Sequence, residues 1–242
     1  MKILSFIPAR GSSERIPNKN IKMLNGKPLI SYTIECAGKS RFINRVVVST
    51  DSAEIADVAV KYGAEVPFMR PASISNSNST EMEFFEHALT WFKDNEDYTP
   101  DLIVLLYPTS PFRKTESIDK AIELMLDNSD ADSLRSIKLC SEHPYKMWIS
   151  KDKYIEPFAK TDDPNMQTLS TQLFPKVYIQ NASIYITKVS TIRNKKSPIG
   201  DKVIPFIMDE IESVDINTYL DFEFAEMICG KERILSLEGS KE

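Results

Sequence analysis

Three short apolar runs, separated by amphipathic stretches, constrain the fold of this chain more than any other feature. The runs are Lys2–Ile7, Arg45–Thr50 and Leu102–Tyr107, each of strand length and rich in branched residues. Apolar residues at helical spacing predict helices over 29–37, 55–62, 82–92 and 118–125. Buried strands alternating with amphipathic helices are typical of βαβ units. We therefore predict an α/β fold with a mostly parallel, Rossmann-like sheet and helices on both faces.

The alternation of strand-like and helix-like segments ends at about residue 134. The stretch 143–185 is richer in Pro, Thr, Gln and Asp, with strand-like pieces at Lys146–Ile149 and Ser183–Thr187. We interpret it as a small hairpin-rich lobe inserted into one domain that covers 1–242. Val203–Ile207 then predicts a further strand, and Thr218–Ile228 a closing helix.

Composition narrows the class of protein. The 242 residues carry 30 Lys+Arg against 35 Asp+Glu, a net charge of −5, which disfavours a nucleic-acid partner. No apolar run approaches the length of about 18–20 residues that spans a membrane, and the apolar start is interpreted as a core strand. Three widely spaced cysteines, Cys36, Cys140 and Cys229, indicate a reducing cytoplasm. With only His87 and His143 as histidines, oxygen ligands and hence Mg²⁺ are expected for any metal.

The loop Pro8–Asn20 follows the first predicted strand and concentrates groups that bind phosphate. It holds three cations, Arg10, Arg15 and Lys19, together with a glycine and two serines. Ligands bind at the carboxyl ends of parallel strands, where backbone N–H groups and cations can surround a polyphosphate. The loop matches neither a P-loop nor a dinucleotide fingerprint. A solvated charged turn is the alternative interpretation.

Two more segments follow predicted strands. In Ser49–Asp51, Thr50 or Asp51 is suited to cap the next helix, and Glu54 completes a pattern like a capping box. Tyr107–Arg113 has two prolines that fix its path, two hydroxyls and an arginine. A turn with a helix cap would account for it equally well.

The segment Ser213–Asn217 follows the last predicted strand. Alternation directs the Asp215 and Asn217 side chains to one face, with Val214 and Ile216 behind them. Two oxygen ligands on one face suit a Mg²⁺ ion that also binds substrate phosphates. Capping of the closing helix by Asn217 or by the next residue, Thr218, is the competing explanation. No nucleophile elbow or activated Cys–His pair is present.

Several short sequence motifs are spread along nearly the whole chain. They are ARGSSERIPNKN (9–20), NGKPLI (25–30), VVSTD (47–51), YGAEVPF (62–68) with Arg70–Pro71, PTSP (108–111) with Arg113, HPYK (143–146), NASIYI (181–186) and SVDIN (213–217). Together they resemble the acylneuraminate cytidylyltransferase family, the CMP-sialic acid and CMP-nonulosonate synthetases.

The resemblance implies a nucleotidyltransferase fold and a reaction. CMP would pass from CTP to a nine-carbon (nonulosonic) sugar acid with release of pyrophosphate, for cell-surface glycans such as lipopolysaccharide. It implies catalytic roles for Arg10, Lys19 and Asp215, nucleotide binding by Ala9, Gly11, Ser12, Ser13, Arg15, Asn20, Arg70 and Thr80, and sugar binding by Tyr107, Thr109, Ser110, Lys146, Tyr178 and Asn181. Mg²⁺ would be held by Asp215 and Asn217, and the lobe would form a homodimer.

The chain departs from the family pattern at four places. Glu14–Arg15 replace a Lys-Gly pair, Tyr107 replaces a glutamine, and Asn217 replaces an aspartate. The arginines usual between Gln167 and Asn181 are absent, and Thr171 and Ile179 lie near those places. Alternatives therefore stay open: another sugar nucleotidyltransferase, acting on Kdo or a sugar 1-phosphate, or a nucleotide-binding homologue without catalysis. A panel of nucleotides and sugars would discriminate among them.

Overall fold

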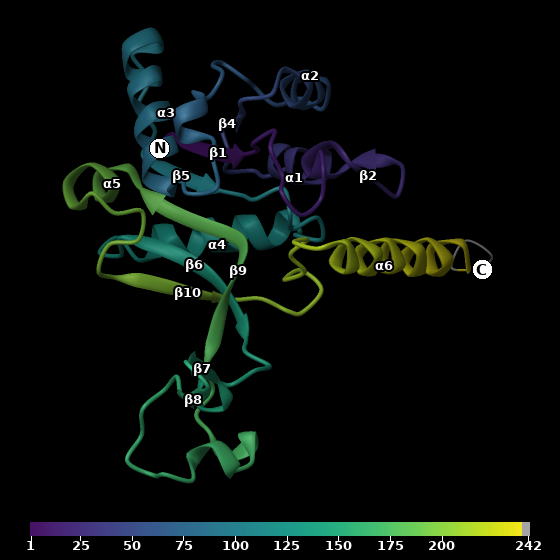
Figure 1. Ribbon diagram of the computed structural model, residues 1–242. Coiled ribbons are helices and arrows are strands. Elements are labelled where there is room, and N and C mark those ends of the chain that lie inside the picture. The colour runs from purple at the N-terminus through teal and green to yellow at the C-terminus, as the bar shows by residue number, and fades with distance from the viewer. Residues whose placement is uncertain (239–242) are drawn as a thin grey trace.

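A mixed, mainly parallel sheet forms the centre of the computed structural model, which describes residues 1–238. Its strands are β1 (Ile3–Pro8), β4 (Arg45–Ser49), β5 (Leu102–Leu105), β6 (Ser133–Leu139), β9 (Tyr178–Lys188) and β10 (Val203–Ile207). Their order is β10-β6-β9-β5-β1-β4 (Figure 1). Neighbours run parallel except around β9, which is antiparallel to both β5 and β6. The predicted fold class is confirmed.

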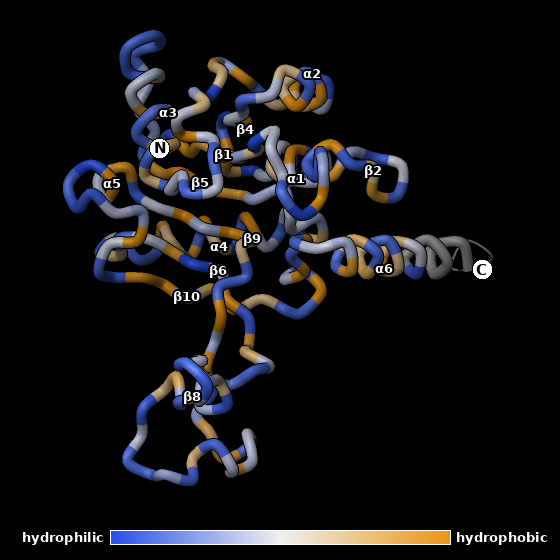
Figure 2. The backbone as a smooth tube through the Cα atoms, viewed as in Figure 1, coloured by the Kyte–Doolittle hydropathy of each residue, from blue (hydrophilic) through white to orange (hydrophobic). Residues whose placement is uncertain are grey.

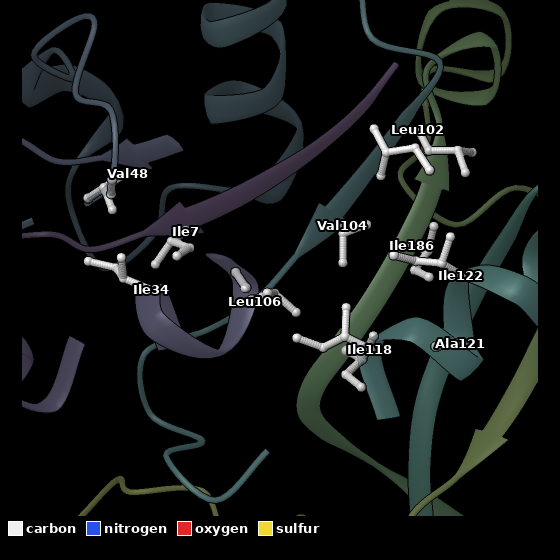
Figure 3. Packing of buried hydrophobic residues seen from close by; sticks show 14 of the residues in the cluster. Ile7, Ile34, Val48, Leu102, Val104, Leu106, Ile118, Ala121, Ile122 and Ile186 are labelled. Atoms are coloured by element: carbon white, nitrogen blue, oxygen red, sulfur yellow. The ribbon is translucent and has the colours of Figure 1, made fainter. Parts of the chain in front are cut away.

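Helices cover both faces of this sheet, as predicted. They are α1 (Leu29–Gly38), α2 (Ala53–Lys61) and α4 (Thr115–Asp127) on one face, and α3 (Glu81–Glu96) and α5 (Val189–Lys195) on the other. Alternate strand residues bury against opposite layers: Ile7 packs with Ile34 of α1 (Figure 3), whereas Phe6 stacks on Phe84 of α3. Sequence patterning missed β6, in which Arg135 and Lys138 interrupt the apolar residues, and α5, which has only seven residues.

The antiparallel strand β9 is the main departure from the expected sheet. Ser183–Thr187, assigned to the lobe from sequence, lies in β9 between β5 and β6. The chain leaves the sheet at the end of β6 and returns to the sheet at that same edge. It can therefore re-enter only in the opposite direction, because a parallel return would need a long crossover.

The lobe lies between β6 and β9 and projects from the sheet (Figure 1). It contains the hairpin of β7 (Trp148–Lys151) and β8 (Tyr154–Pro157) and three short 3₁₀ turns. Of the range 143–185 predicted for it, residues 178–185 belong to β9. The rings of His143 and Phe174, with centroids 4.7 Å apart, pack the two ends of the lobe together. Figure 2 shows hydrophilic residues along much of its outer loop.

The last helix, α6 (Tyr219–Glu238), extends sideways from the body (Figure 1). Its base packs in a small separate core with the hairpin of β2 (Met23–Leu24) and β3 (Lys27–Pro28). Ile16 of the first loop and Ile216 are fully buried in that core, so it joins the two ends of the chain. None of the helices within 1–238 is both long and apolar enough for a membrane span.

Candidate active site

The first loop is fixed by its own hydrogen bonds and by one buried anchor. The Gly11 N–H donates to Asp51 Oδ1 (2.7 Å), and Asn20 Nδ2 donates to the Arg10 carbonyl (3.0 Å). Ile16 is fully buried beneath the loop. The backbone path at the carboxyl end of β1 is therefore set before any ligand arrives, which lowers the entropy cost of binding.

Asp51 has a role that sequence reasoning assigned elsewhere. The cap of α2 is Ser52, whose Oγ accepts the Ile55 N–H, so the expected cap at Thr50 or Asp51 was wrong. Asp51 turns instead toward the first loop. The available signal was its position directly after β4, at the same edge as the loop.

Asp51→Ala should weaken CTP binding about tenfold, because the loop loses a hydrogen bond to a charged acceptor. Asp51→Asn keeps an acceptor at this place and should lose less. The measurement is the Kd for CTP by titration calorimetry, with Asp57→Ala, an exposed position on α2, as the matched control. Equal affinities in all three variants would contradict this role.

A pocket of about 250 Å³ opens above the loop; we call it the first pocket. Its walls come from the first loop, the segment 70–84 and the end of β5. The lining residues include Arg10, Ser12, Ser13, Lys19, Asn20, Arg70, Ser75, Asn76, Ser77, Ser79, Glu81, Phe84, Tyr107, Pro108 and Thr109. Eight of the predicted site residues thus share one cavity: Arg10, Ser12, Ser13, Lys19, Asn20, Arg70, Tyr107 and Thr109.

Arg70 is the most conspicuous donor in the first pocket. It is 6% exposed, and within the described chain its Nε and Nη2 have no hydrogen-bond partner. Its guanidinium carbon lies 5.8 Å from the Phe84 ring centroid. Burial and the nearby Arg10 lower its pKa, opposed by Asp51. A buried guanidinium with free donors is expected to meet an acceptor on a ligand.

Tyr107 is tied into a buried polar chain. Its hydroxyl donates to Glu81 Oε1 (2.9 Å), and the other oxygen of Glu81 accepts from Arg135 at 3.3 Å. Burial and the neighbouring carboxylate raise the pKa of Tyr107 far above its ordinary value. The phenol therefore stays protonated and donates, which fixes Glu81 at the wall of the first pocket. Sequence reasoning did not find Glu81.

Lys19 joins the first pocket to the segment before α6. Its Nζ donates to the Ile216 carbonyl (2.8 Å), and the Ile216 N–H donates to the Thr109 carbonyl (2.9 Å). Lys19 and Thr109 line the first pocket, whereas Asp215 lines a neighbouring one. The bonds among Lys19, Thr109 and Ile216 therefore connect the walls of the two cavities, and we call these three residues the seam.

Burial lowers the pKa of Lys19, with help from Arg10 and against the raising effect of Asp215. The protonated amine is the form that attracts phosphate, so affinity for CTP should fall as pH rises through this pKa. The loss should begin at a lower pH than for an ordinary lysine. We expect the Kd for CTP to rise between pH 7 and 10 in the native protein. In Lys19→Arg, which stays charged, the profile should be flat; parallel profiles would exclude Lys19 as the titrating group.

The second pocket, about 480 Å³, lies between the end of β6, β9, the 210–215 segment and α6. Its lining includes Asn181, Ser213 and Asp215. Asn181 Nδ2 donates to Ser213 Oγ (2.8 Å), and Asn181 Oδ1 accepts from Ser136 Oγ (2.6 Å). The β6–β9 register is irregular here, and Ala182 has a positive φ of 53°. Such bulges direct side chains toward sites.

Asp215 is suited to hold a cation. Among the described residues its Oδ1 is buried without a hydrogen-bond partner, while Oδ2 accepts from Asn217 Nδ2 (2.6 Å). The predicted common face of Asp215 and Asn217 is thus present. No cluster of three or more His, Cys, Asp or Glu able to ligate a metal occurs in the described part of the chain. One free carboxylate oxygen fits Mg²⁺, which usually takes one or two carboxylates and completes its shell with phosphates and waters.

Two other predicted sugar contacts, Lys146 and Tyr178, are not among the residues that line the two pockets. Lys146 Nζ donates to the Gln167 and Leu169 carbonyls (2.5 and 2.6 Å), so it ties the lobe together. Tyr178 lies exposed at the start of β9, opposite Leu139.

The remaining predicted nucleotide contacts have structural positions. Thr80 caps α3 in a full capping box with Glu83, and Ala9 is buried in the main core. Arg15 is exposed on the first loop, and Gly11 holds the loop through its N–H.

Two residues of the Tyr107–Arg113 segment point inward rather than into a pocket. Ser110 Oγ donates to the Ala182 carbonyl at 3.3 Å. Arg113 is 4% exposed and donates to the Ser183 and Tyr107 carbonyls (2.8 and 2.9 Å). The guanidinium group of Arg113 therefore fixes the loop after β5 against β9.

The similarity to known proteins extends over nearly the whole chain. Residues 4–221 match the family described as Cytidylyltransferase. A CMP-N,N'-diacetyllegionaminic acid synthase of Legionella pneumophila is 36% identical over 94% of this chain and 96% of its own length. A pseudaminic acid cytidylyltransferase of Campylobacter jejuni is 30% identical, with 94% and 96% covered.

An N-acylneuraminate cytidylyltransferase of Escherichia coli is 33% identical over 95% of this chain, which spans 52% of that relative. The solved structure of a CMP:2-keto-3-deoxy-manno-octonic acid synthetase complexed with CTP shares the fold. Its TM-score is 0.68 at 14% identity, with 96% of this chain and 100% of that chain covered.

Proposed function

This chain belongs to the cytidylyltransferase family, and we propose on that basis that it transfers CMP from CTP to a nonulosonic acid. The observation that carries the proposal is the seam of Lys19, Thr109 and Ile216, which connects the walls of the two pockets. One pocket offers cations and free donors for a nucleoside triphosphate. The other offers polar groups and a free carboxylate oxygen for a second substrate. A transfer between two bound molecules requires this adjacency.

In the proposed reaction the anomeric hydroxyl of the sugar attacks the α-phosphorus of CTP. The bond from that phosphorus to the bridging oxygen of the β-phosphate breaks, pyrophosphate leaves, and the hydroxyl loses its proton. Arg10 and Lys19 offset the negative charge of the triphosphate, and the free donors of Arg70 are available to the nucleoside. Most of the rate gain in phosphoryl transfer comes from such positioning and charge stabilisation.

Mg²⁺ is the metal we propose for this site, held by Asp215 Oδ1 and by the carbonyl oxygen of the Asn217 side chain. When bound it would supply charge stabilisation at the α-phosphate. Mn²⁺ binding followed by electron paramagnetic resonance in the presence of CTP provides the test. Asp215→Asn should weaken Mn²⁺ binding at least tenfold, and unchanged binding would contradict the assignment.

Pyrophosphate release tests the reaction itself. CTP and Mg²⁺ are incubated with N-acetylneuraminic, N,N'-diacetyllegionaminic or pseudaminic acid, or with Kdo, and UTP replaces CTP in matched wells. Release with a nonulosonic acid and CTP supports the proposal. Binding of CTP without release in any well would contradict it, and release with Kdo alone would assign the chain to a different substrate.

Because CTP is a cytoplasmic nucleotide, we place the reaction in the cytoplasm.

We also propose that two copies associate through the lobe. The hairpin β7–β8 carries large exposed apolar side chains, among them Trp148 (48% exposed) and Ile155 (61%). The Ser150–Ile155 pairing puts Trp148 and Ile155 on one face of the hairpin. Exposed apolar patches on a small projecting unit are typical of interfaces.

The double substitution Trp148→Ser with Ile155→Ser should raise the dimer dissociation constant about 100-fold, because large apolar anchors dominate interfaces. Sedimentation velocity at micromolar concentration measures it. Val60→Ser, an exposed apolar position on α2 (59% exposed), is the control. A native protein that sediments as a monomer would refute the dimer.

A further inference from the structure

The second pocket has a wall of large apolar side chains. Four residues form it: Leu139 at the end of β6, Ile179 of β9, Ile211 in the segment before α6, and Phe224 in α6. They are 55%, 48%, 45% and 45% exposed, respectively. Four different segments contribute, so the wall is a property of the assembled site. We call these four residues the apolar wall.

Part of the polar lining of the same pocket already has partners. Asn181 and Ser213 bond to each other, and Asp215 lies beside the seam. Among the residues that line this pocket, Lys138 carries the one positive charge. Ser141, Gln180, Glu210 and Asp221 line the pocket as well, so the part without hydrogen-bonding side chains is the apolar wall itself.

From the apolar wall, and resting on the proposed function, we infer the class of sugar. The second pocket selects nonulosonic acids whose outer carbons carry acylamino and methyl groups, over those with a trihydroxylated three-carbon tail. Methyl and acetyl groups gain from contact with Ile211 and Phe224, whereas hydroxyls placed there lose water without a replacement. Ile179, near a place where the family pattern has arginine, adds an apolar side chain to the lining.

The position of the wall favours a sugar over another protein chain as its occupant. The apolar wall shares its cavity with Asp215, one residue from the seam, and the volume of about 480 Å³ suits a sugar of this size. Leu220, on the same helix as Phe224, is more exposed at 73% and lies outside the pocket. It therefore provides a matched control for the wall.

The first experiment compares kcat/KM at saturating CTP for N-acetylneuraminic, N,N'-diacetyllegionaminic and pseudaminic acids. At least one of the two diacylamino sugars should exceed neuraminic acid about 10- to 100-fold. The two diacylamino sugars differ in stereochemistry, so their separate wells show which one is used. Equal or better use of neuraminic acid would overturn the inference while leaving the proposed function intact. Silence with every sugar would instead remove the proposed function.

The second experiment tests the wall directly. Phe224→Ala and Ile211→Ser should each raise KM for the preferred sugar about tenfold and narrow its advantage over neuraminic acid, with the Kd for CTP unchanged. Leu220→Ala should leave all three quantities unchanged. If Phe224→Ala changes the sedimentation coefficient and leaves KM for the sugar unchanged, the wall is an interface between copies and the inference fails.

Discussion

Asp215→Asn should lower kcat for pyrophosphate release about 100- to 1,000-fold and leave the Kd for CTP within about threefold of the native value. The substitution keeps the shape of the side chain and removes the charge from its buried, unpartnered oxygen. CTP binds mainly through the first pocket, whereas Asp215 lines the second. Stopped-flow measurement of pyrophosphate, with calorimetry for CTP, separates the two effects.

The control for this prediction lies in the same stretch of chain. Asp209→Asn removes an equal charge from an exposed carboxylate whose Oδ1 accepts the Glu212 N–H, a bond that an asparagine can retain. Its turnover should remain within twofold of the native rate. Near-normal turnover of Asp215→Asn would remove Asp215 from the reaction, and equal losses in both variants would indicate a structural cause.

Arg113→Met should reduce the free energy of unfolding by about 3 kcal/mol. Arg113 is buried and donates to two carbonyls, to the Ser183 hydroxyl and to the Thr33 hydroxyl. Burial lowers its pKa to about 10, opposed by the nearby Cys36 and Glu212, so it remains charged at neutral pH. Methionine fills a similar volume but removes all four of these donated hydrogen bonds. Urea unfolding followed by circular dichroism gives the difference.

Two further variants show whether the loss of stability comes from the buried guanidinium group. Arg113→Lys keeps the charge but cannot reproduce the planar fork, so it should recover only part of the loss. Arg193→Met, at an exposed position on α5, should change stability by less than about 0.5 kcal/mol. A native-like unfolding midpoint for Arg113→Met would show that the buried fork contributes little to stability.

Sequence periodicity was sufficient for most of the layers. Continuous apolar runs marked β1, β4 and β5, because these strands are covered on both faces, and helical spacing marked α1 to α4, because each helix buries one face. The direction of β9 could not be read in the same way. Its residues have the composition of any buried strand, and its antiparallel direction depends on where the lobe returns to the sheet.

The candidate site, too, was predicted only in part from the sequence. The strand-end rule placed Arg10, Lys19 and Asp215 near one edge, since it depends only on chain order and sheet direction. The family resemblance could not distinguish Lys146, which bonds to lobe carbonyls, from a sugar contact. Glu81 escaped notice because its partner, Arg135, lies 54 residues away and depends on tertiary packing.

The bond from Lys19 to the Ile216 carbonyl joins positions 197 apart in the chain. During synthesis, the residues of the first loop leave the ribosome long before the segment that carries Asp215. A nascent chain can therefore assemble most of its sheet while the reactive seam is still incomplete. On the proposed function, competence for transfer requires residues 215–217 to be in place, so a product truncated before them is expected to be inactive.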